Sequence, residues 1–265
     1  MFYRLVESSV NIPGGELNYV SFGKGQKNLI IIQGLNVRDV KGAGASLALM
    51  YRLFLKSYRV WLFDRRMIVK EGLTNWDLAD DIYYAMKELN IESADVFGVS
   101  QGGMIAMALT LEHPERVNKL VLGVTSSRAN ENIKNVVSKW VDCAFNKDSI
   151  TINKETFSLM YTDKYLKKYK LFMPLLVKMI KPKNFDRFAI LASAILNFDC
   201  YNRLNEIKCP VLVLGGEQDR ITLGEASVEI AEKLNCEIHM YSEYGHAAYE
   251  EAEDFNSRVY EFLLK

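Results

Sequence analysis

Residues 94–103 constrain the fold of this chain more than any other segment. They read Ala-Asp-Val-Phe-Gly-Val-Ser-Gln-Gly-Gly, and a helical pattern of small and apolar residues follows from Met104. A strand that turns directly into a helix brings the positions two before and two after the serine close to other backbone, where only glycine avoids a Cβ clash. We therefore predict a tight strand–turn–helix junction with Ser100 at its apex.

The surroundings of Ser100 match those of a nucleophile elbow. Gly-x-Ser-x-Gly alone is a weak signal, because a chain of this length contains one by chance roughly one time in ten. A loop serine between two turn glycines is the plain alternative. The β-like run before the serine and the apolar helix after it supply the context that the motif requires. In such a junction the serine is strained and its Oγ stands above the sheet.

Composition indicates an ordinary globular protein with a large core. The chain has 265 residues, of which 49% are hydrophobic and 25% are charged, and 33 Lys and Arg residues balance 33 Asp and Glu residues. This balance gives no support to a nucleic-acid partner. A local basic cluster, Lys164–Lys170 with Lys178, Lys181 and Lys183, is most simply a solvated helix face, and a weak patch for an anionic surface is the alternative.

Cysteine spacing and apolar run lengths give no sign of a metal site, a disulfide framework or a membrane anchor. The four cysteines are widely spaced, without a Cys-x-x-Cys or Cys/His cluster. The N-terminus lacks a basic region followed by a long apolar run, and no stretch reaches the length of a transmembrane helix. We expect no cofactor, no metal and no membrane partner, a cytoplasmic location, and a monomer or homodimer.

Apolar runs alternate with helical patterns along most of the chain. Strands are predicted at 3–9, 16–22, 28–33, 59–64, 94–98, 117–123, 210–215 and 236–241, and helices near 46–56, 76–90, 101–113, 224–235 and 247–264. Continuous apolar strands alternating with helices are typical of a buried, mostly parallel sheet. The predicted fold class is α/β, with a mostly parallel central sheet and helices on both faces.

One interval, 126–205, breaks the alternation because none of its runs looks like a central strand. It reads as several amphipathic helices rich in aromatic and aliphatic residues. We predict an inserted all-helical cap at 126–205 and a core domain made of 1–125 and 206–265. Most of the aromatics are expected to form the cap's own core, and a few to line a substrate pocket. The aromatic residues considered for these two roles are Trp140, Phe145, Phe157, Tyr161, Tyr165, Phe172 and Phe188.

A serine hydroxyl needs an adjacent base to act as a nucleophile, and the chain has only three histidines. His113 ends the helix that starts at the junction, so it lies about 20 Å from Ser100. His239 falls inside the last predicted strand and is expected to be a packed or edge residue. His246 follows that strand in a loop, and loops at the carboxyl ends of parallel strands form the functional edge of such sheets. We expect His246 to be the base.

The base in turn needs an acid to hold its tautomer. Asp219 follows the strand at 210–215, and Glu217 is its rival in the same loop. Pairing of Asp219 with Arg220, or a turn-capping role, is the structural alternative. The other recurrent place for such an acid is the loop after the preceding strand, residues 123–128. That loop contains no carboxylate, which strengthens the assignment of Asp219 as the acid. The order Ser100, Asp219, His246 is the chain order expected for such a triad.

The developing negative charge on a substrate carbonyl requires two backbone N–H donors. The elbow places the N–H of Gln101 at the start of a helix. The loop after the strand at 28–33 reads Gln-Gly-Leu-Asn, and we assign its donor to the N–H of Leu35, with Gly34 allowing a close approach.

With these residues in place, the chain resembles the α/β-hydrolase superfamily over essentially its whole length. The resemblance is to small capped esterases and lactonases. It rests on residues 98–103, on His113–Val117 with Leu120–Leu122, and on Ile207–Asp219 with Gly245-His246. It implies a Ser-His-Asp hydrolase that uses no cofactor.

Two departures from the family pattern are visible. Many members carry His-Gly where this chain has Gln33-Gly34. Because the donor there is backbone, catalysis should survive while the substrate side of the pocket differs. The second departure is Asp64-Arg65-Arg66, where relatives often continue with a glycine, and no functional conclusion follows from it.

These observations together predict hydrolysis of a small carboxylic ester or lactone through an acyl-enzyme on Ser100. The same triad also suits carbon–carbon bond hydrolysis, thioester hydrolysis or acyl transfer to an acceptor other than water. A non-catalytic small-molecule receptor on the same fold is a further alternative, and it ranks low because such receptors usually lack a triad member. The fold does not by itself determine function, so the substrate stays open.

Overall fold

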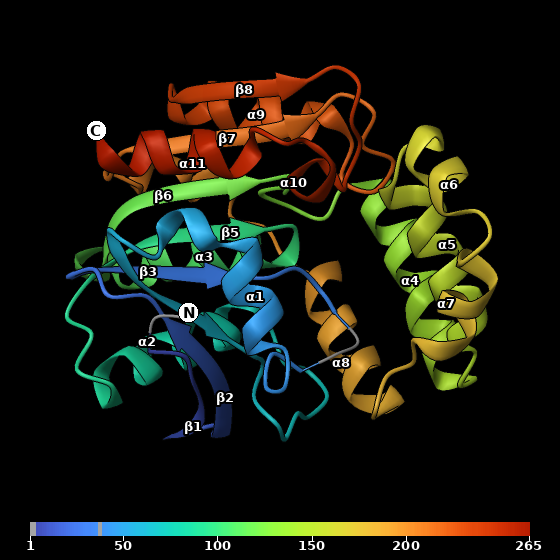
Figure 1. Cartoon of the computed structure of the whole chain (residues 1–265), viewed down its shortest axis with the longest axis horizontal. Coiled ribbons are helices and arrows are strands. Elements are labelled where there is room, and N and C mark those ends of the chain that lie inside the picture. The colour runs from blue at the N-terminus through green and yellow to red at the C-terminus, as the bar shows by residue number, and fades with distance from the viewer. Residues whose placement is uncertain (1–3, 37–38) are drawn as a thin grey trace.

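A twisted eight-stranded sheet forms the centre of the described molecule (Figure 1). The computed structural model describes residues 4–36 and 39–265. Its strands are β1 (Val6–Ile12), β2 (Gly15–Phe22), β3 (Lys27–Ile32), β4 (Tyr58–Phe63), β5 (Ala94–Val99), β6 (Val117–Gly123), β7 (Val211–Gly216) and β8 (Glu237–Tyr241). Their order across the sheet is β1-β2-β4-β3-β5-β6-β7-β8.

Most neighbouring strands run parallel, as the sequence predicts. The pairs β4–β3, β3–β5, β5–β6, β6–β7 and β7–β8 are parallel, whereas β1–β2 and β2–β4 are antiparallel. The strands β5 and β7 are buried along their whole length, and β3 is buried from Leu29 to Ile32, which explains their continuous apolar runs. The α/β fold class is confirmed. The predicted first strand at 3–9 is displaced to β1, and residue 3 lies outside the described residues.

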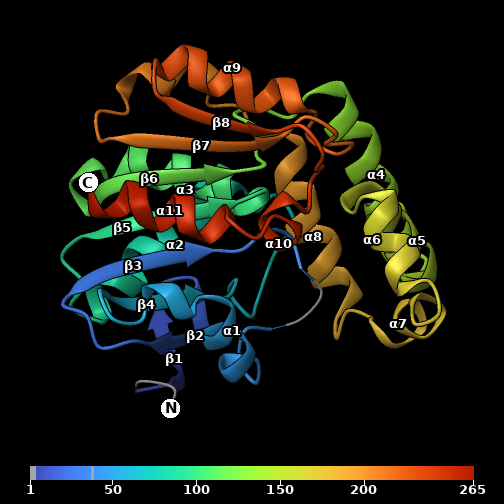
Figure 2. The same ribbon diagram turned by 45° about the horizontal axis from the view of Figure 1, so that its top comes forward.

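Helices cover both faces of the sheet (Figure 2). The helices α1 and α11 pack on one face together with Phe97, while α2, α3 and α9 pack on the other. The α-helices are α1 (Gly44–Met50), α2 (Asn75–Glu88), α3 (Gln101–Glu112), α4 (Glu131–Phe145), α5 (Ser149–Met160), α6 (Asp163–Tyr169), α7 (Met173–Met179), α8 (Phe185–Leu196), α9 (Gly224–Leu234), α10 (Ala248–Glu251) and α11 (Phe255–Leu264). In the part of the chain that the structure describes, short 3-10 helices span Arg52–Phe54, Pro114–Arg116 and Tyr201–Glu206.

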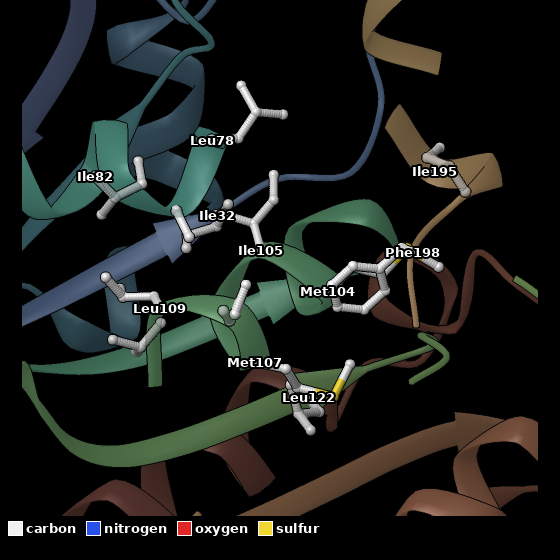
Figure 3. Packing of buried hydrophobic residues seen from close by; sticks show 14 of the residues in the cluster. Ile32, Leu78, Ile82, Met104, Ile105, Met107, Leu109, Leu122, Ile195 and Phe198 are labelled. Carbon is white, nitrogen blue, oxygen red and sulfur yellow. The ribbon is translucent and has the colours of Figure 1, made fainter. Parts of the chain in front are cut away.

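The helices α4–α8 occupy the predicted insertion between β6 and β7. Its two ends lie side by side, since Ala129 N–H donates to the Phe198 carbonyl and Cys200 N–H donates to the Ser127 carbonyl. The insertion shares a hydrophobic cluster with the sheet: Ile195 and Phe198 belong to the same cluster as Met104 and Ile105 of α3 (Figure 3). Because this cluster crosses the predicted boundary, the division into core and cap stays a prediction.

The aromatic residues of the insertion are less buried than the sequence analysis expected. Only Trp140 and Phe188 are buried, whereas Phe145 and Phe172 are exposed. The remaining members, Phe157, Tyr161 and Tyr165, are half-buried. The expectation that most of these rings form an internal core was therefore wrong, because α5–α7 lie along the outer side of α4 rather than around a closed centre (Figures 1 and 2).

The predicted helix at 247–264 is two helices. The chain is extended at Ala252 (φ −82°, ψ 116°), which separates α10 from α11. No glycine or proline marks this break in the sequence. Within the described residues, no helix is both long enough and apolar enough to span a lipid bilayer.

A buried carboxyl group on β5 makes stability depend on pH. Asp95 accepts a hydrogen bond from the Tyr58 hydroxyl at 2.8 Å, yet burial raises the pKa of its carboxyl. The folded carboxyl therefore keeps its proton to a higher pH than the unfolded chain does. Its contribution to the free energy of unfolding is present at low pH and is lost as the pH rises through the folded pKa.

Asp95→Asn removes this titration. We expect the free energy of unfolding of the variant, relative to that of the wild type, to increase between about pH 4 and about pH 7. Urea denaturation at each pH measures this difference. A difference that stays constant or decreases over the same range would show that the Asp95 carboxyl is not raised in the folded state.

Candidate active site

Ser100 stands at the junction of β5 and α3 in a strained backbone conformation. Its φ of 54° and ψ of −125° are unusual for a residue with a side chain. Hydrogen bonds on both sides of the residue hold it. Its N–H donates to the Gly123 carbonyl at 2.9 Å, and its carbonyl accepts the Thr125 hydroxyl at 2.7 Å and the Gly103 N–H at 2.8 Å. The predicted strand–turn–helix junction is confirmed.

The glycines around Ser100 are required by the close approach of three backbone segments. A Cβ at Gly98 would lie 2.4 Å from the Gly102 carbonyl oxygen, and a Cβ at Gly102 would lie 1.9 Å from the Ile32 carbonyl oxygen. Both distances are far below van der Waals contact, so α3 reaches this depth in the sheet only with glycine at these positions. This bears out the steric argument made from the sequence.

The structure brings the three predicted side chains of Ser100, His246 and Asp219 into one chain of hydrogen bonds. His246 Nε2 lies 2.9 Å from Ser100 Oγ, and His246 Nδ1 lies 2.8 Å from Asp219 Oδ2. His246 comes from the loop after β8 and Asp219 from the loop after β7, so both follow the carboxyl ends of parallel strands. Both side chains are buried.

Asp219 is held by its own loop as well as by His246. Its Oδ1 accepts the N–H groups of Ile221 and Thr222, and its Oδ2 accepts the Thr222 hydroxyl. Burial alone would raise the pKa of this carboxyl, but the opposing charge of His246 and these hydrogen bonds lower it below the ordinary value. The carboxylate thus stays ionised beside the imidazole.

The competing candidates for acid and base lie elsewhere. Glu217 is exposed, and Arg220 donates to the Ser158 carbonyl. His113 contacts Asp80 at 3.0 Å, and His239 packs edge-on against Tyr241 of the same strand β8. The turn-capping role considered for Asp219 is present in addition to its contact with His246.

The residues predicted to supply the oxyanion donors, Leu35 and Gln101, lie near Ser100 at the edge of the cavity. A Cβ at Gly34 would lie 3.1 Å from the Ser100 Cβ, so the loop that carries Leu35 passes directly beside the serine. Leu35 and Gln101 both line the cavity that Ser100 faces. Neither backbone N–H donates to an acceptor in residues 4–36 or 39–265. Their role as donors remains a proposal.

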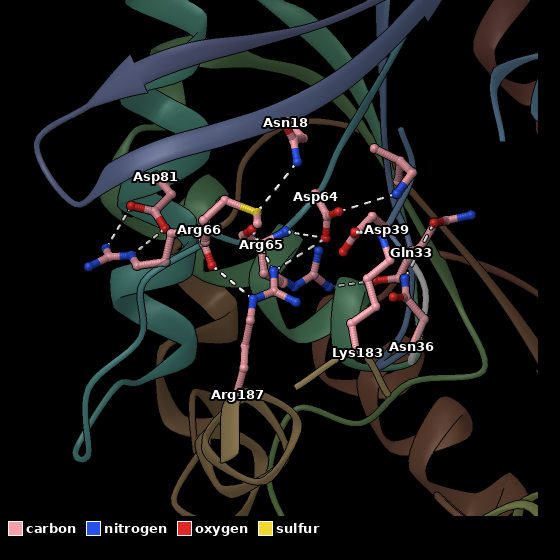
Figure 4. A network of polar contacts seen from close by, with 12 residues as sticks. Asn18, Gln33, Asn36, Asp39, Asp64, Arg65, Arg66, Asp81, Lys183 and Arg187 are labelled. Carbon is pink, nitrogen blue, oxygen red and sulfur yellow. Dashed lines mark hydrogen bonds and ion pairs between the residues drawn. The ribbon is translucent and has the colours of Figure 1, made fainter. Parts of the chain in front are cut away.

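A buried arginine that the sequence analysis left without a role supports this loop. Arg65 Nη2 donates to the Gln33 carbonyl at 2.6 Å, one residue before Gly34 (Figure 4). Burial lowers the pKa of its guanidinium to about 10, so the group remains charged near neutral pH. Asp64 makes a second contact with the chain after β3, because its Oδ2 accepts the N–H of Val40 at 3.2 Å.

The same network reaches the helical insertion. Arg187 of α8 donates to the carbonyl oxygens of Arg65 and Arg66, and it lies 3.5 Å from the Asp64 carboxylate. The carboxyl end of β4, the loop after β3 and α8 are therefore joined by one set of polar contacts (Figure 4). A local sequence signal for these contacts is lacking, because they join segments that lie far apart along the chain.

The side chain of Gln101 is a second feature that the sequence analysis missed. Its Nε2 donates to Asn75 Oδ1 at 3.1 Å and to the Leu191 carbonyl at 2.8 Å. The residue that follows Ser100 thus links α3 to α2 and α8. Its Oε1 is buried and has no partner among the described residues.

An apolar cavity of about 240 Å³ lies between Ser100 and the insertion. Of the described residues that line it, none is a lysine or an arginine, and the only titratable acidic or basic side chains are those of His246 and Glu250. Its apolar wall includes Met104, Val137, Trp140, Phe157, Phe188 and Ile221. The arrangement suits an uncharged organic substrate. Within residues 4–36 and 39–265, no cluster of three potential His, Cys, Asp or Glu ligands for a metal occurs.

Comparison with known proteins assigns the family. A family model described as the alpha/beta hydrolase fold matches residues 29–253. The chain therefore belongs to the α/β-hydrolase fold family.

Curated relatives of this chain are named as hydrolases. The chain is 28% identical, over 93% of its length and 90% of the relative's, to a 2-hydroxy-6-oxononadienedioate/2-hydroxy-6-oxononatrienedioate hydrolase of Paraburkholderia phymatum. It is 29% identical, over 84% of its length and 87% of the relative's, to a putative carbamate hydrolase RutD of a Caulobacter species.

Among solved structures, the enol-lactonase from Burkholderia xenovorans is similar in fold. The superposition has a TM-score of 0.85 at 21% identity and covers 97% of this chain and 100% of that chain. The N-acyl homoserine lactone degrading enzyme Est816 matches with a TM-score of 0.78 at 21% identity and covers 96% and 100% of the two chains. At these identities the likeness concerns the fold.

The contact between Arg65 and Gln33 can be tested through turnover. We expect Arg65→Met to lower kcat for 4-nitrophenyl acetate about tenfold or more with little change in KM, because a displaced loop misplaces the N–H of Leu35. Arg66→Met is the matched control. Arg66 pairs with Asp81 away from the loop, so its loss should reduce stability while kcat stays near that of the wild type. Equal kcat values for the two variants would contradict a positioning role for Arg65.

Proposed function

We propose that this chain is a serine hydrolase that cleaves a small, uncharged carboxylic ester or lactone. The observation that carries the proposal is the continuous hydrogen-bonded path from Ser100 Oγ through His246 to Asp219, facing an apolar cavity. A hydroxyl within reach of an imidazole that a carboxylate orients is the arrangement needed to activate a serine.

In the first half-reaction, Ser100 Oγ attacks the substrate carbonyl carbon while its proton passes to His246 Nε2. Asp219 holds the Nδ1–H of the imidazole and stabilises the positive charge that forms on it. The tetrahedral intermediate carries a negative oxygen. We assign the N–H groups of Leu35 and Gln101 as donors to this oxygen, because both residues line the cavity beside Ser100 and donors at this oxygen stabilise the developing charge.

Collapse of the intermediate breaks the bond to the leaving alcohol, which takes the proton from His246. The acyl group then remains on Ser100 as an ester. A water molecule loses its proton to His246 and attacks this ester, and the proton returns to Ser100 Oγ as the carboxylic acid leaves. For a lactone, the alcohol and the acid belong to one product molecule.

The residues that line the cavity favour a substrate with an uncharged acyl group. An anionic group bound there would be removed from water without a lysine or arginine partner among the described lining residues, and it would share the cavity with the Glu250 carboxylate. Burial of an unpaired charge is strongly unfavourable. Aromatic and aliphatic side chains instead offer dispersion contacts and exclude water.

Hydrolysis of a hydroxy-oxo-dienedioate is the second candidate. The names of the curated relatives favour it, and the same serine, histidine and aspartate suit a carbon–carbon bond cleavage. The absence of a lysine or arginine from the described cavity wall speaks against a substrate that carries two carboxylates. We therefore rank the uncharged ester or lactone first.

Replacement of Ser100 tests the reaction. We expect Ser100→Ala to fold normally by circular dichroism and to lose turnover of 4-nitrophenyl acetate by about a thousandfold or more, as in other triads. Ser127→Ala is the matched control, because Ser127 is a buried serine near the same sheet edge whose Oγ lacks a partner among the described residues. Activity that survives in Ser100→Ala would contradict the scheme.

A matched pair of substrates tests the charge preference. We expect kcat/KM for 4-nitrophenyl butanoate to exceed that for 4-nitrophenyl hemisuccinate by about tenfold or more near neutral pH, because only the second must bury a carboxylate. Initial rates followed at the nitrophenolate absorbance give both values. A preference for the hemisuccinate, or for a hydroxy-oxo-dienedioate, would favour the second candidate over the first.

A further inference from the structure

The outer helices of the insertion carry a strong local excess of positive charge. Residues 164–183 contain seven lysines and no acidic residue, although the whole chain has no net charge. Asp163 and Asp186 bound this stretch, and Lys183 pairs with Asp39. The stretch spans most of α6 and all of α7, which lie on the side of the insertion farthest from the sheet (Figures 1 and 2).

Large apolar side chains project into solvent from the same stretch. Leu171 is 90% exposed, Phe172 61%, Leu175 58% and Met179 63%. Spacings of three and four residues align Phe172, which directly precedes α7, with Leu175 and Met179 along one side of the helix. Four exposed large apolar residues within nine positions are uncommon on a surface that only faces water.

The opposite side of α7 is anchored to the insertion. Val177 is buried, and the buried Asn153 amide of α5 donates to the carbonyl of Val177 at 2.8 Å and to that of Ile180 at 2.5 Å. The exposed apolar row is therefore held outward by contacts that keep the other side of α7 inward. A shallow apolar groove of about 590 Å³ runs between α5 and α7, and Lys154, Lys170 and Lys178 edge it.

We propose that the surface formed by α6 and α7, residues 164–183, docks on an anionic lipid surface. Lysines attract acidic headgroups, and the row of Leu171, Phe172, Leu175 and Met179 enters the boundary between headgroups and acyl chains. Both features lie on one stretch, and each alone would bind weakly. This proposal replaces the simplest expectation from composition, a solvated helix face without a membrane partner.

Charge selects the lipid surface over a second copy of this chain. Two copies meeting through this surface would bring fourteen lysines together, counted as twice the seven of residues 164–183, with no acidic residue in either stretch. An acidic protein would satisfy the lysines, but it would need a complementary apolar groove for the exposed row. A lipid surface offers negative charge and apolar depth together. The docking proposal does not depend on which reaction Ser100 performs.

Vesicle sedimentation of the full chain tests the proposal. We expect binding to mixed phosphatidylcholine–phosphatidylglycerol vesicles in about 0.1 M salt, where the Debye length is about 10 Å, and little binding to phosphatidylcholine alone. One variant replaces Lys167, Lys168 and Lys170 by Gln. The other replaces Leu171, Phe172 and Leu175 by Ser. Each should weaken binding by about tenfold or more.

Matched substitutions elsewhere control for composition. Lys56, Lys87 and Lys208 changed to Gln, and the exposed Leu49, Met50 and Leu53 changed to Ser, should leave binding at the wild-type level. Circular dichroism of every variant checks folding. Absence of wild-type binding to the anionic vesicles would overturn the proposal. So would binding that depends on the lysines but not on Leu171, Phe172 and Leu175, since that result indicates a general polyanion site, such as one for an acidic protein.

Discussion

The close backbone contact between α3 and the sheet at Ser100 is the constraint on which the site depends. Gly102 lies against the Ile32 carbonyl and Gly98 against the Gly102 carbonyl, so no side chain separates α3 from β3 and β5. The strained φ of Ser100 costs about 1–3 kcal/mol, which surrounding structure must offset. Burial of nearly all of α3 supplies that offset. In return, Ser100 Oγ and the N–H of Gln101 emerge together at the sheet edge.

The other parts of the site reach this edge by separate routes. The loops after β7 and β8 bring Asp219 and His246. The loop after β3 passes beside Ser100 because Gly34 permits it, and Arg65 holds that loop from the end of β4. Contacts from α8 to Arg65 and to Gln101 then couple the insertion to both proposed oxyanion donors. Movement of α8 would therefore affect the reacting centre and the cavity together.

The elements and side chains that local sequence determines were predictable. The elbow, the buried strands and the positions of Asp219 and His246 after their strands all follow from local patterns and from the geometry of parallel sheets. The direction in which the loops turn to bring these three side chains into contact was an inference from chain order.

What the sequence did not reveal depends on contacts between distant segments. Arg65 and Gln33 are separated by 32 positions, and Gln101 and Leu191 by 90, so no periodicity reports them. The extended residue Ala252 separates α10 from α11, and no glycine or proline in the sequence indicates this break. The exposure of Phe145 and Phe172 reflects how α5–α7 are laid along α4, which an amphipathic pattern does not specify.

A crystal structure after reaction with a fluorophosphonate ester tests the central claim most directly. The account predicts one covalent adduct, on Ser100 Oγ, with the phosphonyl oxygen about 3 Å from the N–H groups of both Leu35 and Gln101. An adduct on another residue, or a phosphonyl oxygen directed away from both N–H groups, would contradict it. An unmodified Ser100 after prolonged exposure to the reagent would do so as well.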